Sequence, residues 1–184
     1  MHVSDAQQEV RTVFRGGSVG QLVSGLLWLG SAALATWSTP RNAIVFLVIG
    51  GFFIFPLTQL GLKLLGGPAS LSRDNPLGAL GMQVAFTLPL SLPVVGAVAI
   101  HHLDWFYPAF LVVLGAHYLP FVFLYGMRLF AGLSFGLVSL GIILAHRPGT
   151  AFGTPAWLTG VALIVFAAVG HIVSRKPSAV SREP

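Results

Sequence analysis

Long apolar runs separated by short polar segments dominate the pattern of this chain. Six runs contain no Asp or Glu, and each approaches the roughly 20 apolar residues that a helix needs to cross a bilayer. With ends placed to within about 2–4 residues, the predicted spans cover residues 17–38, 42–64, 79–101, 106–126, 129–146 and 155–173. Lipid leaves an open strand edge unpaired, and the runs are too uniformly apolar for barrel strands. The pattern predicts an all-α fold, a polytopic transmembrane bundle of six helices.

The connection between the fourth and fifth predicted spans decides how many times the chain crosses the membrane. Apolar residues run from Phe106 to Ala145 with one interruption, at Gly126-Met127-Arg128. Gly126 can relax the backbone, and Arg128 can extend its guanidinium to the headgroups. If this stretch were instead one continuous buried region, the count would be five and the C-terminus would change sides.

The positive charges predict the orientation. In the six-span arrangement, eight of the ten Lys and Arg residues fall on the side of the N-terminus, and only Arg41 and Arg147 fall on the other. The positive-inside rule therefore predicts that both termini are cytoplasmic. Trp37, Trp105 and Trp157 all fall at the predicted outer ends, where indole rings favour the headgroup zone.

The segments that flank the spans complete the domain organisation. Residues 1–16 form a predicted cytoplasmic amphipathic segment, residues 17–174 the six-helix transmembrane domain, and residues 175–184 a basic cytoplasmic tail. Ser4 and Gln7 resemble a capping box, and one helical face carries Val3, Ala6, Val10, Val13 and Phe14. A short helix on the inner leaflet fits this pattern, and a frayed polar tail is the alternative. Ala33-Leu34-Ala35 has the form of a signal-peptidase site, although an uncleaved first helix is favoured.

The composition agrees with a membrane protein. Of 184 residues, 55% are hydrophobic and 8% are charged, against about 25% charged in soluble domains. Cysteine is absent, which excludes disulfides and thiol chemistry. The net charge of +5 predicts contact with anionic lipid headgroups rather than binding of nucleic acid, because the basic residues flank the spans. The predicted partner is the lipid bilayer.

Prolines and glycines predict how the helices bend and pack. We expect helix kinks at the prolines inside the predicted spans. These are Pro56, Pro89, Pro93 and Pro120, with Pro108 in the same span as Pro120. We expect the hydroxyls of Thr58, Thr87 and Ser91 to satisfy the freed carbonyl groups. Small-x-x-x-small faces at Gly132/Gly136 and Gly16/Gly20 predict close helix contacts, within the chain or in a homo-oligomer.

The leading candidate site lies in the fourth span. His117 falls near the middle of the bilayer, where an ionisable group is costly and often functional. Together with Tyr118, Tyr125, Gln59 and Gln83 it would line a polar pocket for a small molecule or lipid. Structural hydrogen bonding between helices is the competing interpretation for His117.

A second candidate lies at the outer surface. His101, His102, Asp104 and His146 offer imidazole and carboxylate ligands for a transition metal. Adjacent histidines on a short loop seldom converge on one ion, so an ordinary interfacial loop is the favoured interpretation.

The stretch from Trp105 to Met127 resembles an uncharacterised bacterial family of small multi-pass membrane proteins with a G-A-H-Y-L-P-F signature. The resemblance implies a bacterial inner-membrane protein and brings no activity or required cofactor. The leading functional hypothesis is a transporter or sensor with a cavity beside His117. The alternatives are a metal-dependent membrane enzyme and an accessory subunit of a membrane complex.

Overall fold

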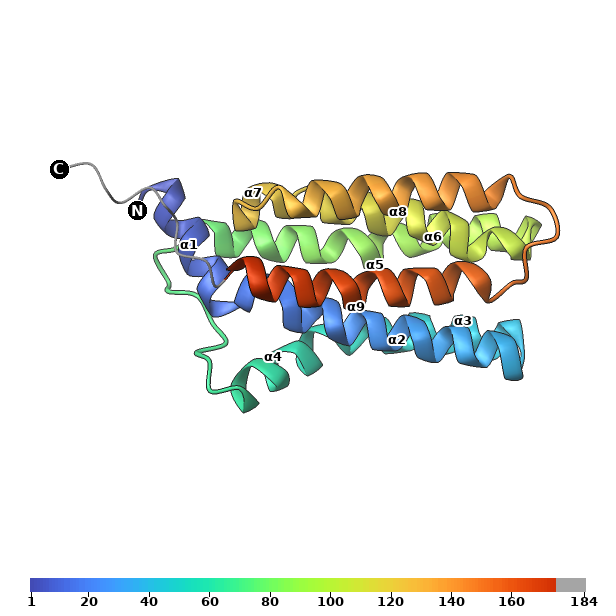
Figure 1. Ribbon diagram of the computed structural model, residues 1–184, viewed down its shortest axis with the longest axis horizontal. Helices are drawn as coiled ribbons and strands as arrows, with labels where there is room; N and C mark the ends of the chain where they lie inside the picture. The colour runs from blue at the N-terminus through green and yellow to red at the C-terminus, as the bar shows by residue number, and fades with distance from the viewer. Residues whose placement is uncertain (175–184) are drawn as a thin grey trace.

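The computed structural model describes residues 1–174, and the regular secondary structure of this part is helical, with no strand. Most helices lie along one long axis (Figure 1). The helices are α1 Val3–Val13, α2 Ser18–Trp37, α3 Pro40–Phe52, α4 Ile54–Leu64, α5 Leu77–His101, α6 Phe106–Tyr118, α7 Phe121–Tyr125, α8 Leu129–Ala145 and α9 Thr154–Ser174, with short 3-10 helices η1 Arg15–Gly17 and η2 Leu103–Trp105. The predicted tail, 175–184, lies outside the described residues.

Several of these helices are membrane-spanning candidates by length and composition. Within residues 1–174, four segments qualify: Arg15–Trp37, Leu77–His101, Leu103–Tyr125 and Thr154–Ser174. The bent pair α3–α4 makes a fifth if it counts as one broken span, and α8 is apolar but shorter. The all-helical fold is therefore confirmed. The presence of apolar spans is also confirmed, and the described residues contain four to five candidates.

The second predicted span is broken. α3 and α4 meet at Phe53 with a bend of 56°. Pro56 explains the break, because a proline ring clashes with the carbonyl four residues earlier, here that of Phe52. Pro120 likewise separates α6 from α7, so two of the predicted kink positions coincide with breaks.

The other prolines leave their helices unbroken. α5 runs continuously through Pro89 and Pro93, and Pro108 lies in the first turn of α6, where proline is tolerated. The hydroxyls expected to satisfy freed carbonyls bond elsewhere. Thr87 donates to Val84 O and Ser91 to Thr87 O, which are not the carbonyls four residues before a proline, and Thr58 Oγ1 has no partner among the described residues.

Glycines bring two helix pairs into close contact. α2 packs on α9, where a Cβ on Gly160 would lie 2.6 Å from Leu29 Cδ2, and α6 packs on α8, where a Cβ on Gly115 would lie 2.7 Å from Ser134 O. Gly132 and Gly136 are exposed with open space around them. The expected contact at that pair is absent within the described chain, and a homo-oligomer through it stays a prediction.

The N-terminal segment is a helix docked on the end of the bundle. α1 buries Ala6, Val10 and Val13 against the protein rather than presenting them to lipid, and it lies beside the start of α5 in Figure 1. The frayed-tail alternative is therefore wrong. The capping box is also absent, because the N-cap is His2 and no side chain caps the helix. Gln7 instead donates to Phe123 O.

Left-handed residues make the tight turns at this end. Arg15, Gly16 and Gly17 have φ of 49°, 65° and 79° and join α1 to α2. Gly126, with φ 60°, ends α7 and allows α8 to fold back along α6. The predicted joint at Gly126-Met127-Arg128 is therefore a turn between neighbouring helices.

Candidate functional site

His117 joins α6 to α5. Its Nδ1 lies 2.9 Å from Thr87 Oγ1, and Thr87 Oγ1 also lies 2.7 Å from Val84 O, to which it donates. Because a hydroxyl has one hydrogen, the Nδ1–H of His117 donates to Thr87. The imidazole also packs on Phe121, with ring centroids 5.1 Å apart. This geometry fits an interhelical structural hydrogen bond.

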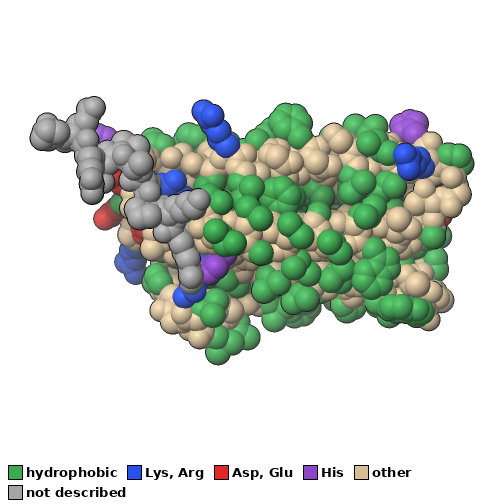
Figure 2. Space-filling model, in the orientation of Figure 1, with side chains coloured by type: hydrophobic (Ala, Val, Ile, Leu, Met, Phe, Trp, Pro, Cys, Tyr) green, Lys and Arg blue, Asp and Glu red, His purple; other side chains and the backbone are tan. Residues whose placement is uncertain are grey.

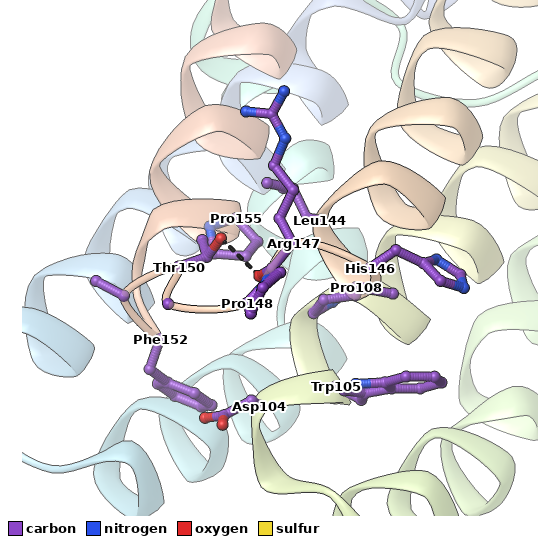
Figure 3. Close-up of a pocket in the computed structure, with 13 residues that line it drawn as sticks. Asp104, Trp105, Pro108, Leu144, His146, Arg147, Pro148, Thr150, Phe152 and Pro155 are labelled. Carbon is purple, nitrogen blue, oxygen red and sulfur yellow. Dashed lines mark hydrogen bonds between the residues drawn. The ribbon is translucent and has the colours of Figure 1, made fainter.

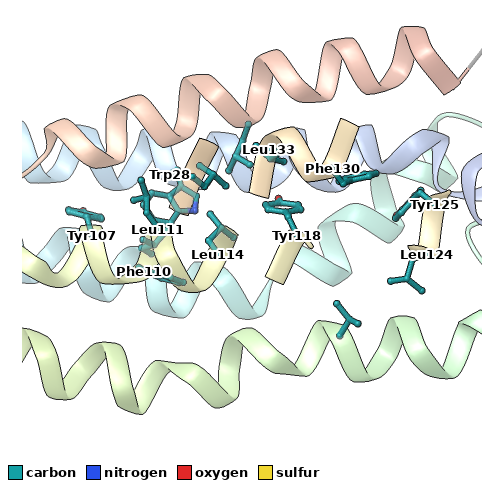
Figure 4. Close-up of a cluster of buried hydrophobic side chains, with 14 of the residues drawn as sticks. Trp28, Tyr107, Phe110, Leu111, Leu114, Tyr118, Leu124, Tyr125, Phe130 and Leu133 are labelled. Carbon is teal, nitrogen blue, oxygen red and sulfur yellow. The ribbon is translucent and has the colours of Figure 1, made fainter. Parts of the chain in front are cut away.

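Tyr118 and Tyr125 belong to a buried cluster with Phe130 (Figure 4), and the partly buried Phe121 packs against it. The rings of Phe121 and Tyr125 stack with centroids 5.6 Å apart, and those of Tyr125 and Phe130 lie 5.0 Å apart. The Ser24 side chain of α2 neighbours the Tyr118 phenol. The two tyrosines therefore help to fill the core.

The two predicted glutamines lie elsewhere. Gln83 is exposed on α5, and Gln59 is half-buried on α4. Among residues 1–174, no hydrogen bond joins either amide to His117, Tyr118 or Tyr125. The structure thus brings His117, Tyr118 and Tyr125 into one region, while a ligand pocket formed by all five residues stays a prediction.

A polar face of α2 was not predicted. Ser18, Gln21, Ser24 and Ser31 are all buried. Ser31 Oγ donates to Ala43 O at 2.9 Å and lies 2.6 Å from the hydroxyl of Tyr107, so it ties α3 and α6 to α2. The signal was the helical spacing of these polar residues, which recur on one side of a span that is otherwise apolar.

A second polar cluster holds α1 in place. The Glu9 carboxylate accepts hydrogen bonds from the backbone N–H and hydroxyl of Ser72 and from Asn75 Nδ2, which also donates to Ala6 O. We name Glu9, Ser72 and Asn75 the Glu9 clasp. The Ser72 backbone N–H, followed by Asn75, lowers the pKa of Glu9 below its ordinary value.

A pocket of about 310 Å³ lies at the opposite end of the bundle, between the α5–α6 and α8–α9 connections. Asp104, Trp105, His146, Arg147 and Phe152 are among its lining residues (Figure 3). Thr150 Oγ1 donates to Arg147 O at 3.1 Å and so braces the α8–α9 loop over the pocket. The Asp104 carboxylate lies beside the Phe152 ring, and the Arg147 side chain extends away from it.

The predicted metal ligands are divided around this pocket. Asp104 and His146 line it, whereas His101 and His102 do not. The Trp105 ring lies between the two imidazoles, with centroids 5.7 Å from His102 and 6.2 Å from His146. Within residues 1–174, no group of three or more His, Asp or Glu side chains could hold a metal ion. The metal centre stays a prediction that this geometry does not favour.

The class of protein follows from three features: apolar helices of spanning length, exposed apolar side chains along the bundle, and polar groups at its ends. Together they define a membrane-embedded helical protein. More particularly, the chain belongs to a family described as a family of unknown function (DUF7010), which matches residues 3–173. The resemblance to an uncharacterised family is therefore confirmed. Comparison with curated proteins and with solved structures found no match in either case.

Proposed function

We propose that this protein crosses a bacterial inner membrane six times, with both termini in the cytoplasm, and binds a small molecule at its outer end. The six crossings would be α2, the pair α3–α4, α5, the pair α6–α7, α8 and α9. The shortest, α8, has 17 residues, the lower limit of the roughly 17–25 that span a bilayer.

The charge distribution supports this orientation. Arg11, Arg15, Lys63, Arg73 and Arg128 belong to the end that carries α1, whereas Arg41 and Arg147 belong to the other. Figure 2 shows charged side chains mainly near the two ends of the visible face, with hydrophobic side chains between them. The positive-inside rule then assigns the α1 end to the cytoplasm.

Single-cysteine labelling tests the topology cleanly, because the chain has no cysteine. Ser38→Cys, between α2 and α3, should react with a membrane-impermeant maleimide on cells with an opened outer membrane. Ser70→Cys, between α4 and α5, should react only after the inner membrane is disrupted. The reverse pattern, or equal labelling of both variants, would refute the orientation.

The observation that carries ligand binding is the pocket beside Asp104 and Phe152. A cavity of about 310 Å³ is at the lower end of the range for small-molecule sites, which combine apolar walls with a few polar groups. It is formed where two interhelical connections meet, so a ligand there would join α6 to α8 and α9. This arrangement suits a membrane sensor.

Ligand-induced stabilisation of the detergent-purified protein tests this function. Choline, glycine betaine and succinate are suitable probes, because they present a cation, a zwitterion and a dianion to a pocket that the Asp104 carboxylate lines. We expect at least one probe to raise the melting temperature in proportion to its occupancy. Asp104→Asn should change that response, and Asp74→Asn, in the α4–α5 loop, is the matched control. No stabilisation by any of the three, or equal responses in both variants, would contradict the proposal.

A transporter with a site beside His117 is the second candidate. Among the six proposed crossings, α3–α4 is bent by 56°, and the helical hydrogen-bonding of α6–α7 is interrupted at Leu119–Pro120, directly after His117 and Tyr118. Discontinuous helices line the substrate sites of many transporters. In a transporter, His117→Cys should react with impermeant thiol reagents from at least one aqueous side, whereas Leu133→Cys, in the packed core, should not. Protection of both would leave the sensor as the better proposal.

A further inference from the structure

The pocket between the α5–α6 and α8–α9 connections has a corner that combines negative charge with an aromatic ring. Figure 3 shows the Asp104 carboxylate beside the Phe152 ring, and both residues line the cavity of about 310 Å³. Asp104 is exposed, and Phe152 is partly buried against the core. A ligand in this corner would therefore meet a carboxylate and an aromatic ring together.

Contacts with the core hold the Phe152 ring in position. Its centroid lies 4.9 Å from that of the buried Tyr107 ring. The Tyr107 hydroxyl in turn lies 2.6 Å from Ser31 Oγ, which donates to Ala43 O. The aromatic wall of the pocket is thus anchored to α2 and α3. A wall that is already ordered reduces the free energy that binding must spend on ordering side chains.

The basic side chains that line the pocket are directed away from this corner. The Arg147 side chain extends away from the Asp104 carboxylate in Figure 3. His146 Nδ1 lies 2.9 Å from Ile142 O, and a carbonyl oxygen only accepts, so the Nδ1–H of His146 donates within the end of α8. The imidazole also packs against Trp105, with ring centroids 6.2 Å apart. An anion beside Asp104 would meet a like charge with no facing cation, so the corner favours a cation.

We propose that this corner binds a quaternary ammonium group, with its charge facing the Asp104 carboxylate and its methyl groups against the Phe152 ring. The inference names the ligand class of the pocket and so rests on the proposed function. Aromatic faces attract such cations through the ring quadrupole. A fully methylated nitrogen has no N–H donor to satisfy, which suits walls that include Pro108, Pro148 and Pro155. The group belongs either to a free solute or to a lipid headgroup, because both carry the same chemistry.

A pair of matched probes tests the role of charge. Choline and its neutral analogue, in which a tert-butyl group replaces the trimethylammonium group, have nearly the same shape. In maltoside detergent, which brings no ammonium group, choline should raise the melting temperature at concentrations at least about fivefold lower than the analogue. Equal responses would mean that apolar contact alone drives binding and would overturn the inference. A response to succinate alone would also overturn it and leave the proposed ligand site standing, whereas no response to any probe would refute both.

Substitutions in the corner test its location. Asp104→Asn should weaken the choline response at least about fivefold. Phe152→Leu should weaken it about three- to tenfold, whereas Phe152→Tyr should keep it, because tyrosine retains the aromatic face. Each shift is measured from the ligand-free melting temperature of the same variant, which separates lost binding from lost stability. Asp74→Asn is the matched control, and an undiminished response in Asp104→Asn or Phe152→Leu would overturn the inference.

Two short-chain phospholipids, added to the same micelles, separate the sources of the ammonium group. A stronger response to free choline than to phosphatidylcholine would identify a soluble cation. A stronger response to phosphatidylcholine, which the matching phosphatidylglycerol does not reproduce, would identify a lipid headgroup. Equal stabilisation by both phospholipids without a response to choline would mean that the acyl chains or the phosphate make the contacts, and would overturn the inference.

Discussion

At the residue scale, the hydrogen bond between His117 and Thr87 yields a direct prediction. His117→Phe and Thr87→Val should each leave membrane insertion intact and change stability modestly, because neither side chain is at the centre of the core. The two effects should be coupled by about 0.6 kcal/mol, the average for interhelical hydrogen bonds in membranes. Unfolding of the four proteins of this double-mutant cycle in mixed micelles measures the coupling.

The pair Ser91→Ala with His117→Phe serves as the control, because Ser91 bonds within its own helix to Thr87 O. That pair should show weaker coupling than the Thr87 pair. Additive effects of Thr87→Val and His117→Phe would mean that the hydrogen bond contributes nothing to stability. That result would favour the functional interpretation of His117 over the structural one.

Gly115 carries a second prediction at this scale. An added Cβ would lie 2.7 Å from both Ser134 O and Val138 Cγ2, so Gly115→Ala should force α6 away from α8 and destabilise the protein by about 1–3 kcal/mol. The same change at the exposed Gly136 should be nearly neutral. Chemical denaturation of both variants measures the two changes in unfolding free energy. Equal stabilities would contradict the close packing of α6 on α8.

Individual residues were the hardest level to predict from the sequence. His117 stands out in any reading of an apolar span, but its partner Thr87 is thirty positions away along the chain. Gln21 went unnoticed, because a glutamine near the predicted start of a span resembles a residue at the water boundary. Its burial depends on how η1 places α2 against α9, which no local pattern specifies.

At the element scale, the Glu9 clasp makes the docking of α1 dependent on pH. The pKa of Glu9 is lower in the folded protein than its ordinary value, which is about 4.3 in unfolded peptides. The stabilisation is therefore fully present above that ordinary pKa and is lost as the pH falls through the lowered one. Hydrogen exchange of residues 3–13 should show protection at neutral pH that declines under acid conditions.

Two variants of α1 make this test specific. Glu9→Gln removes the charge, so protection of α1 should be weaker at neutral pH and should depend less on acid. Asp5→Asn removes an exposed charge outside the clasp, and its pH profile should match that of the wild type. Identical profiles for Glu9→Gln and the wild type would show that the clasp does not hold α1.

Elements were predicted well where one rule governs them. The apolar periodicity and length of the runs place α2, α5, α8 and α9 close to their observed bounds. Breaks were harder, because Pro56 and Pro120 interrupt their helices whereas Pro89 and Pro93 do not. The same residue type gives both results, since tertiary contacts decide whether a proline bends or breaks a helix.

At the scale of the whole molecule, the sequence predicted the class of fold better than the location of the pocket. Hydropathy was sufficient for an all-helical membrane protein. The pocket beside Asp104 combines residues from two connections more than forty positions apart, so no sequence motif marks it. Two of its lining residues, Asp104 and His146, entered the sequence prediction for the different reason that they can bind metals.

The helix lengths predict which bilayers suit this protein. α8 has 17 residues and so spans about 26 Å, less than the roughly 30 Å of an average hydrocarbon core, while α5 has 25 residues and can tilt. A short helix is matched by thinning the bilayer, at a modest cost for each ångström. The melting temperature in nanodiscs should therefore be higher with short acyl chains than with long ones. Extending α8 by one apolar turn after Ala145 should move the optimum toward thicker bilayers. A wild-type optimum in long-chain lipid would mean that α8 does not cross the membrane alone, and the six-crossing topology would then fail at this helix.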